Sequence, residues 1–306
     1  MKKQIKKAGN QPNPAFGLYL GDARTPAFRL EGLARMYANL HDKKFFSRLS
    51  KQVKQFEDGL GEVDHYTVLE KEFTPNTKVP VEIKNYFAEK ANTASEQLNK
   101  ALRKEKWLNG EKIKSIKEGL KSVEWMSQKD EINAITGFYK KEITGIAAFI
   151  RGCTFTDMEN DVHELRRKLR WLSIYAGALQ GKVALMDEKS TPDFLKKYLT
   201  PQIVQSPFNK IVASPEFKKH VQLNKGYFLA LSWIIAELGR IKDNGLRIMA
   251  LTEAFMHTAS VPEKEALKRT YTVLGAQYPT TEVLLKRSAA ISKTFLKEGN
   301  LERLLW

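Results

Sequence analysis

Apolar residues recur at every third or fourth position along nearly the whole chain, and this spacing constrains the fold more than any other sequence feature. It matches the 3.6-residue period of an α-helix and therefore places the apolar side chains on one face of each helix. Lys and Glu fill the positions between them, and the alternating β-branched pattern of half-buried strands is hard to find. We therefore expect an all-α fold whose helices are long enough to build bundles.

The segment from Asp161 to Leu172, "DVHELRRKLRWL", shows this pattern most clearly. As a helix it has one face of apolar residues, typical of a core-facing surface: Val162, Leu165, Leu169 and Leu172. The other face carries four residues at positions i, i+3, i+4 and i+7, which we call the basic stripe: His163, Arg166, Arg167 and Arg170. No acid occupies any of these four positions, so the stripe is a candidate surface for an anion.

Other local signals predict where helices begin. Thr156 followed by Glu159 fits a capping box just before the basic stripe. Ser214 and Pro215 fit a helix cap followed by a proline at the first helical position. The proline-bearing stretch from Thr191 to Pro215 predicts a series of short helices and turns.

The charge balance is unusual for a chain whose 42% hydrophobic and 28% charged residues are otherwise typical of a soluble globular protein. Fifty-one Lys and Arg against 35 Asp and Glu give a formal net charge of +16. Such an excess favours a polyanionic partner, namely nucleic acid, an anionic membrane surface or a phosphate polymer. A solvated basic surface that serves only solubility is the alternative.

Cysteine content and hydropathy bear on the compartment. Cys153 is the single cysteine, which excludes an intramolecular disulfide and a cysteine metal cluster. The basic N-terminal residues are followed by no apolar core of the kind that a secretory signal has. The longest apolar stretch, Tyr227 to Ala236, is too short to cross a bilayer and predicts a buried helix. We expect a cytoplasmic protein with no membrane partner.

Two segments resemble each other and suggest an internal repeat. Leu60 to Phe73 and Leu238 to Phe255 each begin with Leu-Gly, continue with a charged and an aliphatic residue and an Asp, and enter an apolar run. We expect Gly61 and Gly239 to let a helix break or bend tightly. Each copy lies downstream of an arginine-bearing segment, the first of which contains Arg24, Arg29 and Arg35. The simplest organisation is a basic N-terminal tail (1–20) followed by two similar helical halves (21–150 and 151–306).

At this point the sequence resembles the CHAD family, an α-helical domain with characteristic histidines. The family pattern is a His followed at spacings of three, four and seven by basic residues, and "VHELRRKLRWL" satisfies it. "LGRIKD" at Leu238 to Asp243 is similar to the family's Leu-Gly-x-aliphatic-basic-Asp signature. The first half diverges, because Arg24 to Leu40 has no His in register and "LGEVDH" lacks the basic residue before its Asp. The chain would therefore be a divergent member.

The resemblance implies two helical bundles around a basic cleft that binds inorganic polyphosphate without catalysis. Polyphosphate offers only its charge, its spacing and its oxygen geometry for recognition, and the planar guanidinium of arginine suits these features. The residues expected to bind it are the basic stripe, the upstream arginines of the first half and two residues that the resemblance places near the cleft: His163, Arg166, Arg167, Arg170, Arg24, Arg29, Arg35, Lys242 and Arg247.

Signals for an enzyme are weak. The sequence contains no phosphate-binding loop of the Walker type and no HExxH, GxSxG or kinase signature. Its five histidines include no pair at four-residue spacing for a metal site. His163 and Glu159 could form an acid/base pair, but nothing nominates a nucleophile. We expect no catalytic residues, no metal and no cofactor.

Two alternatives remain open at the level of the sequence. A nucleic-acid-binding helical module would share the positive charge and would need aromatic residues among the basic ones for base stacking. Trp171 and Tyr175 flank the basic stripe, although core packing is their more common role. A structural relative that has lost its ligand is the second alternative.

Overall fold

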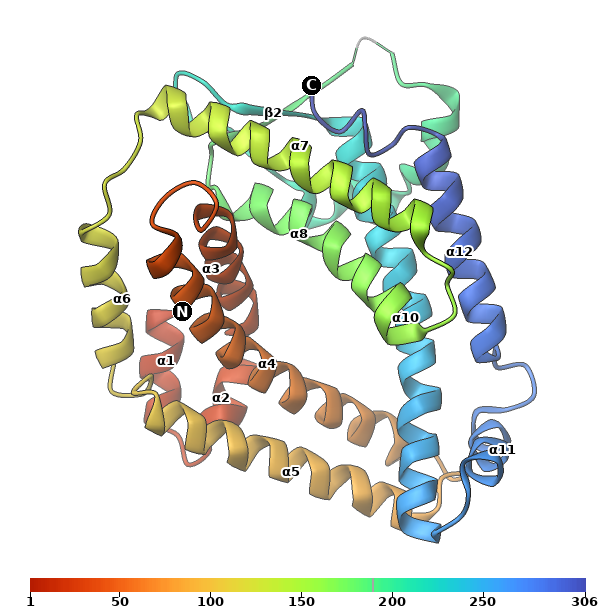
Figure 1. Ribbon diagram of the computed structural model, residues 1–306. Coiled ribbons are helices and arrows are strands. Elements are labelled where there is room, and N and C mark those ends of the chain that lie inside the picture. Colours follow the sequence, from red (N-terminus) through yellow and green to blue (C-terminus); the bar gives the residue numbers. More distant parts are fainter. Residues whose placement is uncertain (189) are drawn as a thin grey trace. The chain divides into compact units, whose positions relative to one another are not determined.

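Helices form most of the protein, and the chain divides into two compact units (Figure 1). The computed structural model describes residues 1–188 and 190–306. Unit 1 comprises Met1–Glu124 and Arg247–Tyr278, and unit 2 comprises Trp125–Leu246 and Pro279–Trp306. Helix α10 (Lys225–Ala259) contributes residues to both. The predicted all-α fold class is confirmed.

Unit 1 is built around three long helices that pack in chain order, α3 against α4 and α4 against α5. Asp42 begins α4 by accepting a 2.9 Å hydrogen bond from the Phe45 amide, which satisfies an otherwise unpaired donor of the first turn. The last residues of α10 complete the unit together with seven helices: α1 (Lys2–Gly9), α2 (Pro14–Leu20), α3 (Arg24–Tyr37), α4 (Lys43–Phe73), α5 (Val81–Lys104), α6 (Glu111–Lys121) and α11 (Glu263–Leu274).

One buried apolar cluster of unit 1 contains residues from four of these elements, α4, α5, α10 and α11. Phe73 at the end of α4 stacks on Phe87 of α5 with ring centroids 5.5 Å apart. Leu251 and Phe255 from α10 and Ala266 from α11 belong to the same buried cluster. Apolar burial between segments far apart in sequence therefore joins residues 247–278 to the N-terminal helices.

Unit 2 contains the only strands found in the described part of the chain. β1 (Val183–Met186) and β2 (Val221–Asn224) pair in parallel, with Val183 beside Val221, and Leu305 near the C-terminus forms an antiparallel bridge to Leu223. The unit also contains the first residues of α10 and seven further elements: α7 (Gln128–Gly152), η1 (Met158–His163), α8 (Glu164–Ala178), η2 (Asp193–Tyr198), α9 (Pro201–Gln205), η3 (Pro207–Asn209) and α12 (Thr281–Lys297).

The domain boundaries differ from those expected. Residues 1–20 form α1 and α2 rather than a tail, because Ile5, Ala8 and Leu18 are fully buried and dock these helices onto the unit. The division falls between Glu124 and Trp125 instead of at residue 150, and residues 247–278 return to unit 1. Apolar contacts across long sequence separations produce this exchange, which a division into consecutive halves cannot represent.

Several local expectations can be compared with the fold. The short helices predicted between Thr191 and Pro215 are confirmed as η2, α9 and η3. The helix predicted to start at Ser214 was wrong, since Ser214 and Pro215 lie in a turn region. Gly61 and Gly239 break no helix and lie inside α4 and α10. None of the described helices is both long and apolar enough to span a bilayer.

The buried face of α8 yields a test of its packing. Leu169 is fully buried, so Leu169→Ala should lower the free energy of unfolding by about 2–5 kcal/mol through lost apolar contact and an unfilled cavity. Arg167→Ala on the exposed face of the same helix should change it by about 0.5 kcal/mol or less. Urea unfolding with hydrogen exchange of the α8 amides measures both, and equal effects would contradict this orientation of the helix.

Candidate functional site

The predicted apolar face of α8 and of the turn before it is the side that packs into unit 2. Val162, Leu165, Leu169 and Leu172 are all fully buried. Tyr139 of α7, itself fully buried, donates a 3.0 Å hydrogen bond to the Leu172 carbonyl and joins the two helices. Burial on one side leaves the basic stripe on the other. Arg167 is exposed, and His163, Arg166 and Arg170 are half-buried.

The start of this helix differs from the predicted capping box. A π-helical turn, η1, precedes α8, and Asp157 caps it by accepting hydrogen bonds from the amides of Glu159 (2.8 Å) and Asn160 (2.6 Å). Asp161 accepts from the amides of Thr156 (2.7 Å) and Asp157 (3.0 Å). The Asp157 carboxylate therefore occupies the helix N-terminus, which is where a phosphate would otherwise find backbone donors, and Asp161 binds the amides of the residues just before it.

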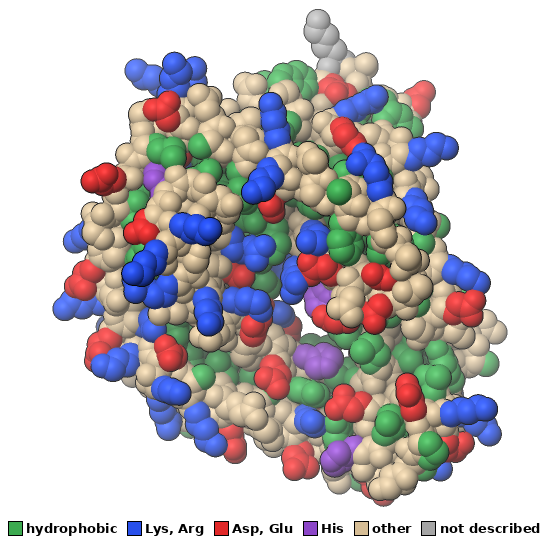
Figure 2. Space-filling model, viewed as in Figure 1, with side chains coloured by type: hydrophobic (Ala, Val, Ile, Leu, Met, Phe, Trp, Pro, Cys, Tyr) green, Lys and Arg blue, Asp and Glu red, His purple; other side chains and the backbone are tan. Residues whose placement is uncertain are grey.

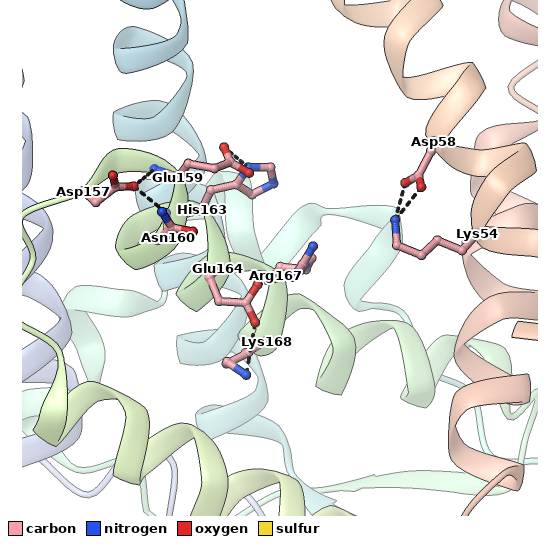
Figure 3. Close-up of polar contacts among 9 residues, drawn as sticks. All are labelled: Lys54, Asp58, Asp157, Glu159, Asn160, His163, Glu164, Arg167 and Lys168. Carbon is pink, nitrogen blue, oxygen red and sulfur yellow. Dashed lines mark hydrogen bonds and ion pairs between the residues drawn. The ribbon is translucent and has the colours of Figure 1, made fainter. Parts of the chain in front are cut away.

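Carboxylates one turn away also reach the basic stripe (Figure 3). His163 Nδ1 lies 2.9 Å from Glu159 Oε2. Glu164 forms ion pairs with Arg167 and, at 3.1 Å, with Lys168. The stripe positions contain no acid, as the sequence indicates, but neighbouring positions partly neutralise them. Figure 2 shows the same mixture more widely, with Asp and Glu interspersed among Lys and Arg.

Arg166 is held against helix α10. Its Nε donates a 3.2 Å hydrogen bond to the Ile235 carbonyl, and its guanidinium lies over Gly239, where an added Cβ would come within 3.0 Å of Nε. The glycine that was expected to bend the helix instead provides a flat surface for an arginine side chain. An added Cβ at Gly239 would push the guanidinium away by a few tenths of an ångström, so the glycine favours this close approach.

Arg24 occupies the corresponding place in unit 1. Its guanidinium lies over Gly61, where an added Cβ would come within 2.7 Å of Nη2. Its Nε contacts Glu57 at 2.6 Å and its Nη1 contacts Asp64 at 2.8 Å. Glu57 precedes Gly61 by four residues, just as Ile235 precedes Gly239 in unit 2. The internal repeat seen in the sequence therefore has a structural counterpart, an arginine that crosses a helical glycine.

The remaining predicted residues have different environments. Arg247 Nε contacts Glu72 of α4 at 2.6 Å, and Lys242 contacts its neighbour Asp243 at 2.8 Å. Arg29 and Arg35 are exposed on α3. Lys242 and the basic stripe belong to unit 2, and Arg24, Arg29, Arg35 and Arg247 belong to unit 1. Within unit 1, Arg24 and Arg247 are bound by acids of α4, which makes a structural role more fitting for them than ligand binding.

The sequence reasoning missed a buried acid pair beside Arg24. Glu31 of α3 is only 2% exposed and Glu57 of α4 only 6%. Burial raises the pKa of Glu31 to about 7, with a further increase from the Glu57 carboxylate, while Arg35 and Lys54 act in the opposite direction. The available signal was an acid at a position of α3 whose neighbours one turn away, Ala27 and Ala34, are core residues.

Neither a metal-binding group nor a match to a known protein points to a further site. Across residues 1–188 and 190–306, no three His, Cys, Asp or Glu side chains come together as a metal-binding group. Comparisons with protein-family models, with curated proteins and with solved structures find no match.

The contact between Arg24 and Gly61 can be tested with an alanine. Gly61→Ala should displace Arg24 from Glu57 and leave a buried carboxylate poorly paired, a loss of about 3 kcal/mol that exceeds the gain of about 1 kcal/mol in helix propensity. The matched control is Gly137→Ala in α7, where an added Cβ has nothing within 4 Å and should stabilise the protein. Thermal unfolding measures both, and stabilisation by Gly61→Ala would refute the contact.

The buried acid makes stability depend on pH. A pKa of about 7 for Glu31 in the folded protein, against about 4.3 when unfolded, means that folding favours the protonated form. That contribution is complete below pH 4, starts to be lost as pH rises above the unfolded pKa and is gone above pH 7, a change of up to about 4 kcal/mol. Glu31→Gln should therefore be more stable than the wild type by roughly 1 kcal/mol at pH 5 and by about 3 kcal/mol at pH 8. Denaturant unfolding at both pH values measures the free energy of unfolding, with the exposed Glu62→Gln as the control. A gain in stability from Glu31→Gln that is equal at both pH values would contradict the raised pKa.

Proposed function

We propose that the protein binds inorganic polyphosphate, or a similar linear polyanion, on the basic stripe of α8 without catalysing a reaction. The observation that carries the proposal is the orientation of α8. Its fully buried apolar face prevents the helix from rotating, so His163, Arg166, Arg167 and Arg170 remain on the opposite side. Both units also have more basic than acidic residues, which would raise the local concentration of any polyanion.

The neighbouring carboxylates weaken this site without abolishing it. The pair of Arg167 with Glu164 joins residues three positions apart on one helix, and such surface pairs contribute only about 0.3–0.5 kcal/mol. A charge-assisted hydrogen bond from arginine to a phosphate oxygen contributes about 1.5–3 kcal/mol. A polyphosphate chain can therefore displace Glu164 from Arg167 at a net gain.

The same comparison argues against Arg24 and Arg247 as ligands. Arg24 neutralises Glu57, whose side chain is 8% exposed, and freeing the arginine would leave a buried charge at a cost of about 3–5 kcal/mol. Arg247 is paired with the half-buried Glu72. We therefore restrict the proposed site to α8. Arg166 positions the helix through Gly239 and Ile235 and would contact the anion only with its outer edge.

The aromatic residues beside the stripe favour polyphosphate over nucleic acid. Trp171 is 5% exposed and Tyr175 only 1%, and the two rings stack on each other with centroids 5.8 Å apart. Neither offers an open face to a nucleobase, which single-stranded nucleic acid binding requires. A phosphate chain without bases needs no such face.

We also propose that the chain is a divergent relative of the CHAD family. The repeated crossing of a glycine by an arginine supports a duplicated helical architecture. In both units the glycine that lies under the arginine belongs to a Leu-Gly motif, at Gly61 in unit 1 and at Gly239 in unit 2. The protein would then have kept the anion-binding helix in unit 2, while the equivalent arginine of unit 1 serves folding.

The test changes the two arginines of the basic stripe other than Arg166, whose side chain lies over Gly239. Arg167→Ala combined with Arg170→Ala should weaken polyphosphate binding at least tenfold, because each removes a charged donor from the proposed surface. Lys264→Ala combined with Lys268→Ala on the exposed face of α11 removes the same charge elsewhere and should have a much smaller effect. Calorimetric titration at fixed salt measures both, since salt alone changes every such affinity.

Three results would contradict the proposal. Unchanged affinity in the folded α8 variant would place the site elsewhere. Stronger competition by single-stranded DNA than by polyphosphate would favour a nucleic-acid-binding module. Absence of binding by the wild type would indicate a relative without a ligand.

A further inference from the structure

A second cationic surface lies in unit 2, where α7 and α12 end beside each other (Figure 1). A hollow of about 360 Å³ opens between the two helix ends. Its lining comes from the last turn of α7 and from one face of α12: Ile150, Arg151, Lys293, Leu296 and Lys297. Three of these five residues are cations, and none is acidic.

The lining combines an apolar floor with a charged rim. Ile150 is fully buried and Leu296 is half-buried, whereas Arg151, Lys293 and Lys297 are exposed. Lys293 and Lys297 are four residues apart on α12 and therefore lie one above the other on the same face. Two like charges at this spacing destabilise a helix by a few tenths of a kcal/mol, so a bound anion would relieve this repulsion.

The nearby acids leave most of this charge uncompensated. Glu302 lies 3.5 Å from Arg151. Glu298, which follows Lys297 in sequence, is already engaged by Lys197 and by the Tyr198 hydroxyl at 2.5 Å. In the part of the chain that the structure describes, Lys293 and Lys297 form no ion pair within 4.0 Å.

Helix dipoles account for only part of the cluster. Cations stabilise helix C-termini, each of which carries about half a negative charge, and Arg151 and Lys297 lie in the last turns of their helices. Lys293 lies one turn earlier and has no such role. Three cations against Glu302 and two half charges leave a local excess of about one positive charge.

We propose that this hollow binds the phosphate group of a small phosphomonoester, with the apolar part of the ligand against the half-buried Leu296. A phosphomonoester carries nearly two negative charges at neutral pH and accepts paired hydrogen bonds from an arginine. The volume is near the lower end of the range of about 300–1,000 Å³ for small-molecule pockets, which suits a compact ligand. The site shares no residue with the basic stripe and does not depend on the function proposed for it.

Phenyl phosphate is a suitable probe, and the Ile150 side-chain methyl in a ¹³C-labelled protein reports binding at this hollow. Phenyl phosphate should shift that methyl signal with a dissociation constant on the order of 1 mM, inorganic phosphate should bind more weakly, and phenol should cause no shift. Lys293→Gln combined with Lys297→Gln should weaken phenyl phosphate binding at least tenfold. Lys286→Gln, an exposed residue on the same helix, is the matched control and should bind normally.

A lipid phosphate head group shares this chemistry, so vesicles containing phosphatidate form a second arm. Binding of phenyl phosphate alone supports a soluble ligand, and binding of the vesicles alone supports a lipid source. No shift of Ile150 with either probe would overturn the proposal, as would unchanged binding in the folded double variant; Arg151→Gln replaces that variant if it does not fold. Polyphosphate binding should be unaffected by Lys293→Gln and Lys297→Gln, which separates failure here from failure of the proposal for α8.

Discussion

The crossing of a helical glycine by an arginine is the interaction on which both units depend. Arg24 lies over Gly61 and Arg166 over Gly239, and in each case the guanidinium donates to a group four residues before the glycine. The missing Cβ allows the side chain to lie flat, and the acceptor fixes its direction. The two acceptors differ in chemistry. A buried carboxylate makes the first contact costly to break, whereas the second contact is made to a backbone carbonyl.

This difference explains how a strongly basic chain can keep only part of its charge for binding. In unit 1, two of the arginines that the sequence analysis predicted as ligands form ion pairs with acids of α4. Glu57 pairs with Arg24, and Glu72 pairs with Arg247. In unit 2 the exposed Glu159 and the half-buried Glu164 each pair with a residue three or four positions away on the same helical segment, and pairs at this spacing contribute little. The positive charge that remains accessible is therefore distributed unevenly, and short-range pairing, rather than net charge, determines where a polyanion can bind.

Sequence periodicity was sufficient for the helices and for the orientation of α8, because Val162, Leu165, Leu169 and Leu172 follow the helical period without interruption. The spacing allows Glu159 and Glu164 to reach the basic stripe, but it could not predict which ion pairs form, since that depends on side-chain rotamers. The return of residues 247–278 to unit 1 and the pairing of β1 with β2 depend on contacts between distant segments, which no local pattern contains. The sequence shows Glu31 only as an acid among core positions. That the second buried acid, Glu57, lies close to it is evident only from the three-dimensional structure.

The central claim is that the arginines of α8 contact polyphosphate directly. Nitrogen-15 NMR of the arginine side chains tests it most directly, because each Nε–Hε group gives its own signal. The account predicts that added polyphosphate shifts the Nε signals of Arg167 and Arg170 strongly and leaves that of Arg24, bound to Glu57, nearly unchanged. Shifts confined to Arg24 or to lysines outside α8, with Arg167 and Arg170 unaffected, would contradict it.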